Sequence, residues 1–155
     1  MIERLFPRQV DNTYRGRPIA RWVFIGLTIM TVGRSLVHMF ASDGGAQSIA
    51  TIPLDTFTPN GADAVVLIFA LWGLSQLIIG LLYVVVLWRY QALIPLMYLF
   101  MIVEYAMRMF LGELKPIETT GTAPGAIGDY IIVPLATVML ILTLWEGRRR
   151  TAEAT

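Results

Sequence analysis

Four long apolar segments alternate with shorter polar ones along this chain. They cover residues 20–40, 62–88, 92–111 and 128–146. A helix needs about 20 mostly apolar residues to cross roughly 30 Å of hydrocarbon, and each segment approaches or exceeds that length. The alternating pattern of a spanning barrel strand is absent, and backbone groups in lipid must form internal hydrogen bonds. The pattern therefore predicts an all-α integral membrane protein built as a four-helix bundle.

Composition supports a single membrane domain. Of 155 residues, 56% are hydrophobic and 15% are charged, whereas about 25% of the residues in a soluble domain are charged. We expect a basic tail over residues 1–18, interfacial or loosely ordered, then a membrane domain over 19–147 and a second tail over 148–155. The first apolar segment is longer than the 7 to 15 apolar residues typical of a signal peptide, so we expect it to be retained.

The distribution of charge predicts an orientation. Basic residues gather in the two tails and beside Arg89, in the link between the second and third segments, whereas Lys115 is the only basic residue in the other two links. Acidic residues collect in those two links: Asp43, Asp55, Asp63, Glu113, Glu118 and Asp129. The positive-inside rule then places both termini in the cytoplasm of a cell (inner) membrane protein. Orientation accounts for the arginines, so no nucleic acid partner is expected.

The chain contains no cysteine and one histidine, His38. These counts exclude thiol exchange through its own residues, thiolate-ligated clusters, and a haem held by two histidines of one chain. We expect His38 to form a hydrogen bond near the membrane surface, and we expect no metal site. A quinone or lipid site needs none of these ligands, so it stays possible.

Three charged residues interrupt the apolar segments away from their first and last residues: Arg34, Glu104 and Arg108. An ionisable side chain at the centre of a bilayer costs about 2.5–3.5 kcal/mol on insertion scales. Arg34 and Glu104 each lie 13 residues from the basic-side start of their segment (Arg21 and Gln91), which is roughly 20 Å along a helix. We therefore expect Arg34 to face Glu104, and Glu104 to pair with Arg108 one turn further along. Two arginines and one carboxylate would leave a net positive charge.

This cluster has two interpretations. In the first it only holds the helices together, because breaking a buried ion pair costs about 3–5 kcal/mol, and Arg108 extends toward the outer surface. In the second it binds a ligand, because its surplus charge attracts an anionic headgroup, a carboxylate or the carbonyl of a quinone. A water-accessible cavity would favour the second interpretation and a dry, fully paired cluster the first. The candidate ligand-binding residues are Arg34, His38, Glu104, Tyr105 and Arg108.

Small residues predict close helix contacts. Gly73, Gln76 and Gly80 share one face of the second segment, where small side chains allow close approach and Gln76 can hydrogen-bond across the contact. The same argument predicts packing at Gly26 and Gly33 of the first segment. The short link at Arg89 predicts that the second and third helices are antiparallel neighbours. The link over residues 112–129 is expected to be a mobile connector.

The first segment reads Arg-Trp-Val-Phe-Ile-Gly from Arg21 to Gly26, followed by Gly33 and Arg34. It resembles the opening helix of DoxX-like membrane proteins, which are small four-helix proteins with a similar basic entry and glycine pair. The long link at residues 42–59 and the charges at Glu104 and Arg108 depart from that group. The resemblance implies an accessory role beside a redox enzyme that oxidises its substrate with a quinone, and it assigns no catalytic residue here.

Two functional hypotheses follow. In the first, the protein is a non-catalytic subunit or accessory partner that contacts membrane lipids and a larger membrane complex or a second copy of itself. In the alternative, it is a small-molecule, lipid or quinone binding protein, carrier or membrane enzyme that uses the intramembrane Arg/Glu site. Glu104 is the only carboxylate expected within the membrane, which argues against acid–base catalysis by paired carboxylates.

Overall fold

A computed structural model describes residues 2–145 and contains no strand within them. The helices are α1 (Ile2–Leu5), α2 (Pro18–Phe40), α3 (Pro59–Arg89), α4 (Ile94–Leu114) and α5 (Pro124–Leu144), with short 3-10 turns η1 (Leu54–Thr56) and η2 (Gln91–Leu93). Four of these helical segments are long and apolar enough to cross a membrane, which confirms the all-α class and the four predicted long apolar helices. The predicted tail over 148–155 and the end of the last span lie outside the described residues.

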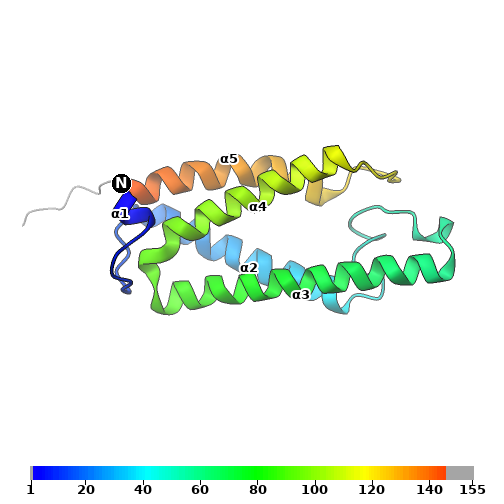
Figure 1. Ribbon diagram of the computed structural model, residues 1–155, viewed down its shortest axis with the longest axis horizontal. Coiled ribbons are helices and arrows are strands. Elements are labelled where there is room, and N and C mark those ends of the chain that lie inside the picture. Colours follow the sequence, from blue (N-terminus) through cyan, green and yellow to red (C-terminus); the bar gives the residue numbers. More distant parts are fainter. Residues whose placement is uncertain (1, 146–155) are drawn as a thin grey trace, which may run out of the picture.

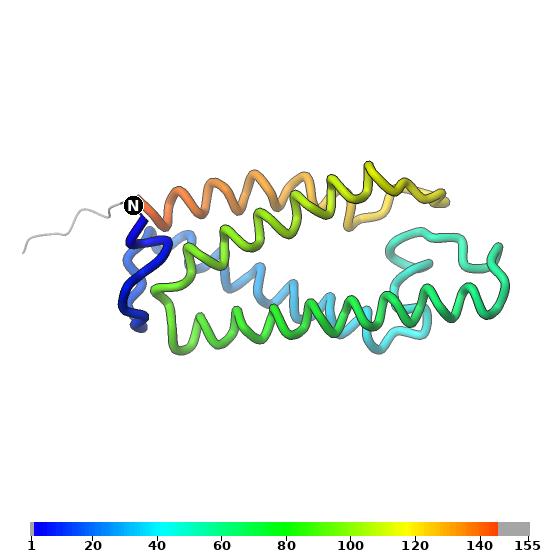
Figure 2. Tube along the Cα trace, viewed as in Figure 1, coloured from blue at the N-terminus to red at the C-terminus, as the bar shows by residue number. Residues whose placement is uncertain are grey.

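The four long helices form two antiparallel pairs, α2 with α3 and α4 with α5 (Figure 1). The pairs converge where the N-terminal segment and the α3–α4 turn lie, here called the turn end. They separate toward the loops 41–58 and 115–123, here called the loop end (Figure 2). The prediction that α3 and α4 are antiparallel neighbours holds at the turn and at one hydrogen bond between their side chains, but each helix packs mainly against another partner, α3 against α2 and α4 against α5. A short link fixes only the ends of two helices, whereas the small-residue face of α3 meets α2.

That small-residue face confirms one packing prediction. A Cβ atom added to Gly73 would lie 2.7 Å from His38 Cβ, and one added to Gly80 would lie 2.9 Å from Val32 Cγ2. Gln76 lies between these glycines and is buried. Glycine is therefore required at both positions, because α2 approaches too closely for any larger residue.

The packing prediction for Gly26 and Gly33 is wrong. A Cβ atom at either residue would meet nothing within 4 Å, and both residues are exposed on the outside of the bundle. The buried face of α2 instead carries small polar side chains with a helical spacing: Thr28, Thr31, Ser35 and His38. Three of their hydroxyl groups donate to carbonyls of their own helix, so they can face the interior without any other partner.

The main apolar core fills the turn end. Phe24 packs its ring 5.2 Å from that of Tyr83 and 5.3 Å from that of Tyr98, measured between centroids. The hydroxyl of Tyr98 donates to the carbonyl of Ala20 at 2.6 Å, so this buried phenol has a partner. A second, smaller apolar cluster holds the loop 41–58 against the start of α3. The space between the two helix pairs at the loop end belongs to neither cluster.

The N-terminal segment packs against the bundle at the turn end. The amide of Ala92 donates to the carbonyl of Asp11 at 3.3 Å, and the amide of Arg17 donates to the carbonyl of Leu142 at 3.1 Å. A Cβ atom on Gly16 would lie 2.7 Å from the Cα of Thr143, so glycine permits this approach. The description of residues 1–18 as a loose tail is therefore wrong for the described part, which is held to α4 and α5.

Candidate ligand site between the helix pairs

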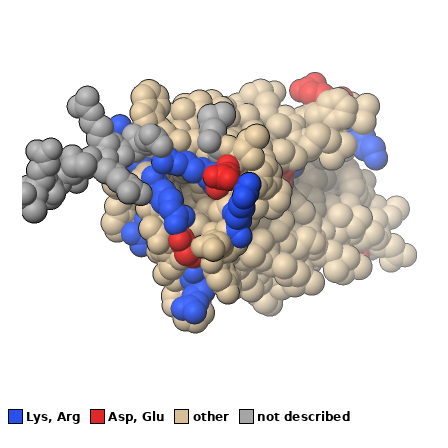
Figure 3. Space-filling view, turned by 60° about the vertical axis from the view of Figure 1, so that its left-hand side comes forward, with Lys and Arg blue, Asp and Glu red and all other residues tan. Residues whose placement is uncertain are grey.

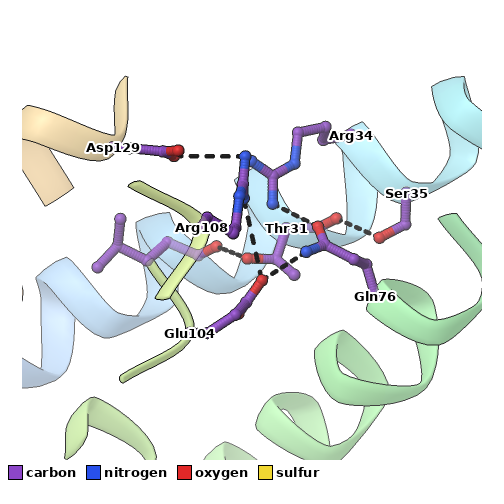
Figure 4. Close-up of polar contacts among 8 residues, drawn as sticks. Thr31, Arg34, Ser35, Gln76, Glu104, Arg108 and Asp129 are labelled. Carbon is purple, nitrogen blue, oxygen red and sulfur yellow. Dashed lines mark hydrogen bonds and ion pairs between the residues drawn. The ribbon is translucent and has the colours of Figure 1, made fainter. Parts of the chain in front are cut away.

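All four long helices contribute to one polar network near the middle of the bundle. Its members are Arg34 from α2, Gln76 from α3, Glu104 and Arg108 from α4, and Asp129 from α5 (Figure 4). The network lies where the helix pairs begin to separate. It therefore adds polar contacts between the two pairs beside the edge of the main apolar core, which includes Tyr105 and Ile132.

Gln76 connects the two charges that were expected to touch. Nη2 of Arg34 donates to Oε1 of Gln76, and Nε2 of Gln76 donates to Oε1 of Glu104 at 2.5 Å. The predicted equal depth of Arg34 and Glu104 is confirmed, because one side chain reaches both. Their direct pairing is wrong, because the amide lies between them and no ion pair within 4.0 Å joins these two described residues.

Arg108 contacts both carboxylates of the network. Its Nη1 lies 3.9 Å from Oε1 of Glu104, and its Nη2 lies 3.3 Å from Oδ1 of Asp129. The first contact confirms the predicted pair along α4. The second shows that Arg108 points inward, with a side chain 21% exposed, and does not extend toward the outer surface.

Asp129 is the charged residue that the sequence analysis assigned to a polar link. The prediction placed Asp129 at the boundary between the link and the fourth segment, whereas the structure begins α5 at Pro124, so Asp129 lies beyond the first turn of the helix and is 7% exposed. The Pro at the first helical position was a usable signal, since proline favours that place. With Asp129 included, two arginines face two carboxylates. The expected net positive charge is therefore wrong, and the network is formally neutral.

Two aromatic rings flank both guanidinium groups. The Cζ atom of Arg34 lies 5.8 Å from the ring centre of Trp72 and 5.7 Å from that of Tyr105. The Cζ atom of Arg108 lies 5.1 Å and 4.9 Å from the same rings. The negative faces of aromatic rings stabilise cations at such distances, by about 2 kcal/mol when desolvated. Tyr105 was a predicted site residue, whereas Trp72 was not singled out.

His38 joins the network to the outer loop. Its Nδ1 lies 2.8 Å from the carbonyl oxygen of Gly44, and its ring centre lies 4.7 Å from that of Trp72. The predicted role of His38 as a hydrogen-bonding residue is confirmed. Among the described residues, no group of three or more His, Cys, Asp or Glu side chains could hold a metal ion.

Four buried polar atoms in the network form no hydrogen bond, although two of them, Nη1 of Arg108 and Oδ1 of Asp129, take part in the ion pairs described above. The four are Nε of Arg34, Oη of Tyr105, Nη1 of Arg108 and Oδ1 of Asp129, and among the described residues no other buried side-chain nitrogen or oxygen is without a hydrogen bond. An unsatisfied buried polar group costs about 1–3 kcal/mol. The unpartnered hydrogen-bonding capacity of the described side chains is therefore concentrated at one place.

A cavity of about 530 Å³ adjoins this place on the loop-end side. Its polar lining comprises Arg34, His38, Arg108 and Asp129, with Trp72 beside them, and also Glu113, Lys115 and Tyr130. Apolar residues line much of the remainder, including Ile49, Ala50, Phe69, Pro116, Ile117 and Ala126. Ligand sites of small lipophilic molecules combine these features, an apolar wall with few convergent polar groups.

The two outer loops are joined near this cavity by hydrogen bonds of Thr51. The carbonyl of Thr51 accepts from the amide of Thr120 at 2.9 Å, and the hydroxyl of Thr51 donates to the carbonyl of Gly121 at 2.8 Å. Thr51 has a φ of 57°, which a β-branched residue rarely adopts. The expectation that the link over 112–129 is a mobile connector is therefore wrong in part, since this contact ties it to the first loop.

Comparison of the chain with protein-family models, with characterised proteins and with solved structures gives no match. The site is therefore defined by its own geometry.

Proposed function

We propose that this chain is a membrane-embedded binding protein for the oxygen-bearing head of a small lipophilic molecule, such as a quinone or a lipid. One observation carries the proposal. Among the described residues, the buried side-chain polar atoms that form no hydrogen bond all belong to the network beside the cavity, and three of the four side chains line it. A cluster that served only to hold helices together would be fully paired.

Hydrogen-bonding capacity defines the head of the ligand. The unpartnered atoms supply three donors, from Arg34, Arg108 and Tyr105, and one acceptor, from Asp129. A complementary head is therefore rich in acceptors, as carbonyl oxygens are. Two arginines and two carboxylates already balance in charge, so an uncharged head leaves the site neutral. This argument favours a quinone or an ester carbonyl over a carboxylate.

Binding requires movement of at least one guanidinium group. The unpartnered atoms are covered by neighbouring side chains, whereas other atoms of Arg34 and Arg108 line the cavity. A ligand oxygen that enters the cavity can draw one of these long side chains toward itself. The free energy gained on binding is large because a donor that formed no hydrogen bond before the ligand entered forms one with the ligand oxygen.

The topology proposed from the sequence predicts toward which side of the membrane the cavity opens. If the turn end with its arginines is cytoplasmic, as the positive-inside rule indicates, the cavity opens near the outer surface. A binding protein of this kind can also serve as the non-catalytic subunit of a larger complex. The resemblance to DoxX-like proteins supports that context, and the cavity supports the binding role within it.

Purification from native membranes followed by mass spectrometry of bound small molecules, lipids and proteins tests the proposal. We expect a stoichiometric lipophilic molecule with the wild type and its loss from Arg108→Gln. Ala50→Phe should also lose it, because this change fills the cavity without altering any charge of the network. Arg89→Gln, an exposed arginine at the other end, serves as the control. A partner protein without any small molecule would favour the accessory-subunit hypothesis.

A further inference from the structure

A second hollow, of about 340 Å³, lies at the turn end, opposite the cavity described above. Figure 3 shows this end of the molecule, where basic side chains surround a depression. Three arginines line the hollow, namely Arg4, Arg8 and Arg15, and two carboxylates lie with them, Glu3 beside Arg8 and Asp11 beside Arg15. This cluster of guanidinium groups is a different chemistry from the network in the bundle.

The hollow is enclosed by the N-terminal segment. Residues between Glu3 and Gly16 form one side, and Ala92, Pro95 and Thr143 of the bundle form the other. The segment is fixed there by the backbone bonds of Asp11 and Arg17 and by Nη1 of Arg4, which donates to the carbonyl of Leu144 at 3.2 Å. The arginines are thus presented by an ordered part of the chain.

The ion pairs within the hollow leave it receptive to a stronger anion. Nε of Arg8 lies 3.4 Å from Oε1 of Glu3, but these side chains are 87% and 74% exposed, and exposed pairs contribute little. Arg15 is fixed through both oxygens of Asp11. That contact sets its position at the rim and leaves part of its guanidinium available. Planar guanidinium groups match the geometry of phosphate oxygens.

Two further features raise the positive potential at this end. Helix α4 begins beside the hollow, with Gln91, Ala92 and Pro95 among the lining residues, and the start of a helix carries partial positive charge. Arg17 and Arg21 lie at the same end of the bundle, at the start of α2. The field therefore attracts anions toward an enclosed space that can hold one.

We propose that this hollow binds a phosphate group, supplied either by the headgroup of an anionic phospholipid or by a soluble phosphate compound. This site does not depend on the function proposed for the intramembrane cavity. It lies where the apolar spans end, so a phospholipid headgroup at the membrane surface can reach it. The shared chemistry is a phosphate held by Arg8 and Arg15 above the start of α4.

One experiment with two arms distinguishes a phospholipid headgroup from a soluble phosphate compound as the source of the phosphate. The full chain is placed in nanodiscs of phosphatidylcholine alone or of an equal mixture with phosphatidylglycerol, and native mass spectrometry measures retained phosphatidylglycerol. In the phosphatidylcholine discs, inorganic phosphate and glycerol 3-phosphate are titrated by calorimetry. Retention of phosphatidylglycerol alone assigns the phospholipid, and saturable binding in the second arm assigns a soluble compound.

Three variants test the site itself. Arg8→Gln with Arg15→Gln should weaken binding by about fivefold per charge removed, whereas Arg89→Gln, which lies outside the hollow, should change it less than twofold. Gln9→Trp fills the hollow at constant charge and should also abolish binding. The proposal is overturned if neither arm shows binding. It is also overturned if Arg89→Gln weakens binding as much as the double variant, or if Gln9→Trp has no effect, since each indicates only a diffuse surface charge.

Discussion

The guanidinium of Arg34 and the carboxylate of Glu104 interact through the side-chain amide of Gln76. The amide accepts from Arg34 with its oxygen and donates to Glu104 with its nitrogen, at 2.5 Å. A primary amide can serve a cation and an anion at once because it carries both an acceptor and donors. The two charges are thereby held in one network, and the second guanidinium of that network, from Arg108, is left to contact Asp129.

Removing this amide should destabilise the bundle. In Gln76→Leu, Arg34 loses its acceptor and Glu104 loses its hydrogen bond, and we expect a loss of about 2–3 kcal/mol, since bonds to charged groups contribute about 1.5–3 kcal/mol. Unfolding measured by steric trapping in bicelles gives the free energy. Ser75→Leu is the matched control, because Ser75 is exposed and its hydroxyl donates to Leu71 of its own helix. Equal effects of the two changes would contradict the bridging role.

Glycine substitutions should separate the two faces of the α2–α3 pair. Gly73→Ala places a methyl group 2.7 Å from His38 Cβ and 3.0 Å from the Ser35 carbonyl, so we expect a destabilisation of about 1–3 kcal/mol from overpacking. Gly26→Ala meets nothing within 4 Å and should be neutral or slightly stabilising, because alanine favours helix. Thermal unfolding of both variants in detergent provides the comparison. A large loss at Gly26 would indicate that this exposed face is covered, for example by a second copy of the chain.

The outer loop should lose stability in acid through Asp43. Partial burial raises the pKa of this carboxyl. The backbone amides of Ser48 and Gly45, which donate to it at 2.7 Å and 2.9 Å, have the larger combined effect, so the net pKa is lowered to about 2. Because the folded pKa is below the ordinary value of 3.8, this contribution is present above pH 3.8 and is lost as the pH falls toward 2. Carbon NMR titration of the carboxyl should give the lowered midpoint.

The matched variant for this titration is Asp43→Asn. It should remove the acid dependence of amide protection at Gly45 and Ser48, because the asparagine side chain does not titrate. Protection that still falls with acid in this variant would assign the effect to another group.

The Thr51 contact between the loops 41–58 and 115–123 should restrict access to the cavity beside the polar network. The chain contains no cysteine, so Ile49→Cys introduces a single thiol at the cavity wall. Adding Thr51→Ala and Thr120→Ala removes two hydroxyl hydrogen bonds between the loops. We expect the thiol to react several-fold faster with a water-soluble thiosulfonate reagent. Thr56→Ala, whose hydroxyl bonds only within the first loop, is the control, and an unchanged rate would show that this contact does not limit access.

The four spans and the depth of their charges could be read from the sequence. Long apolar segments leave a chain in lipid few alternatives to helix, so the existence and approximate positions of α2 to α5 follow from hydropathy, although their first residues do not. Helical rise also fixed Arg34 and Glu104 at one level. Gly73, Gln76 and Gly80 were identified as a contact face by their spacing, because residues three and four apart share one side of a helix.

Only the tertiary structure decided which partners these residues have. Spacing along one helix does not say which neighbour its face meets, so Gly26 and Gly33 were assigned to packing although they lie outside the bundle. The start of α5 depends on a proline and on contacts with α4, so Asp129 was assigned to a link although it neutralises the network. The cavity arises because the helix pairs separate at the loop end, a relation between distant segments that no local pattern encodes.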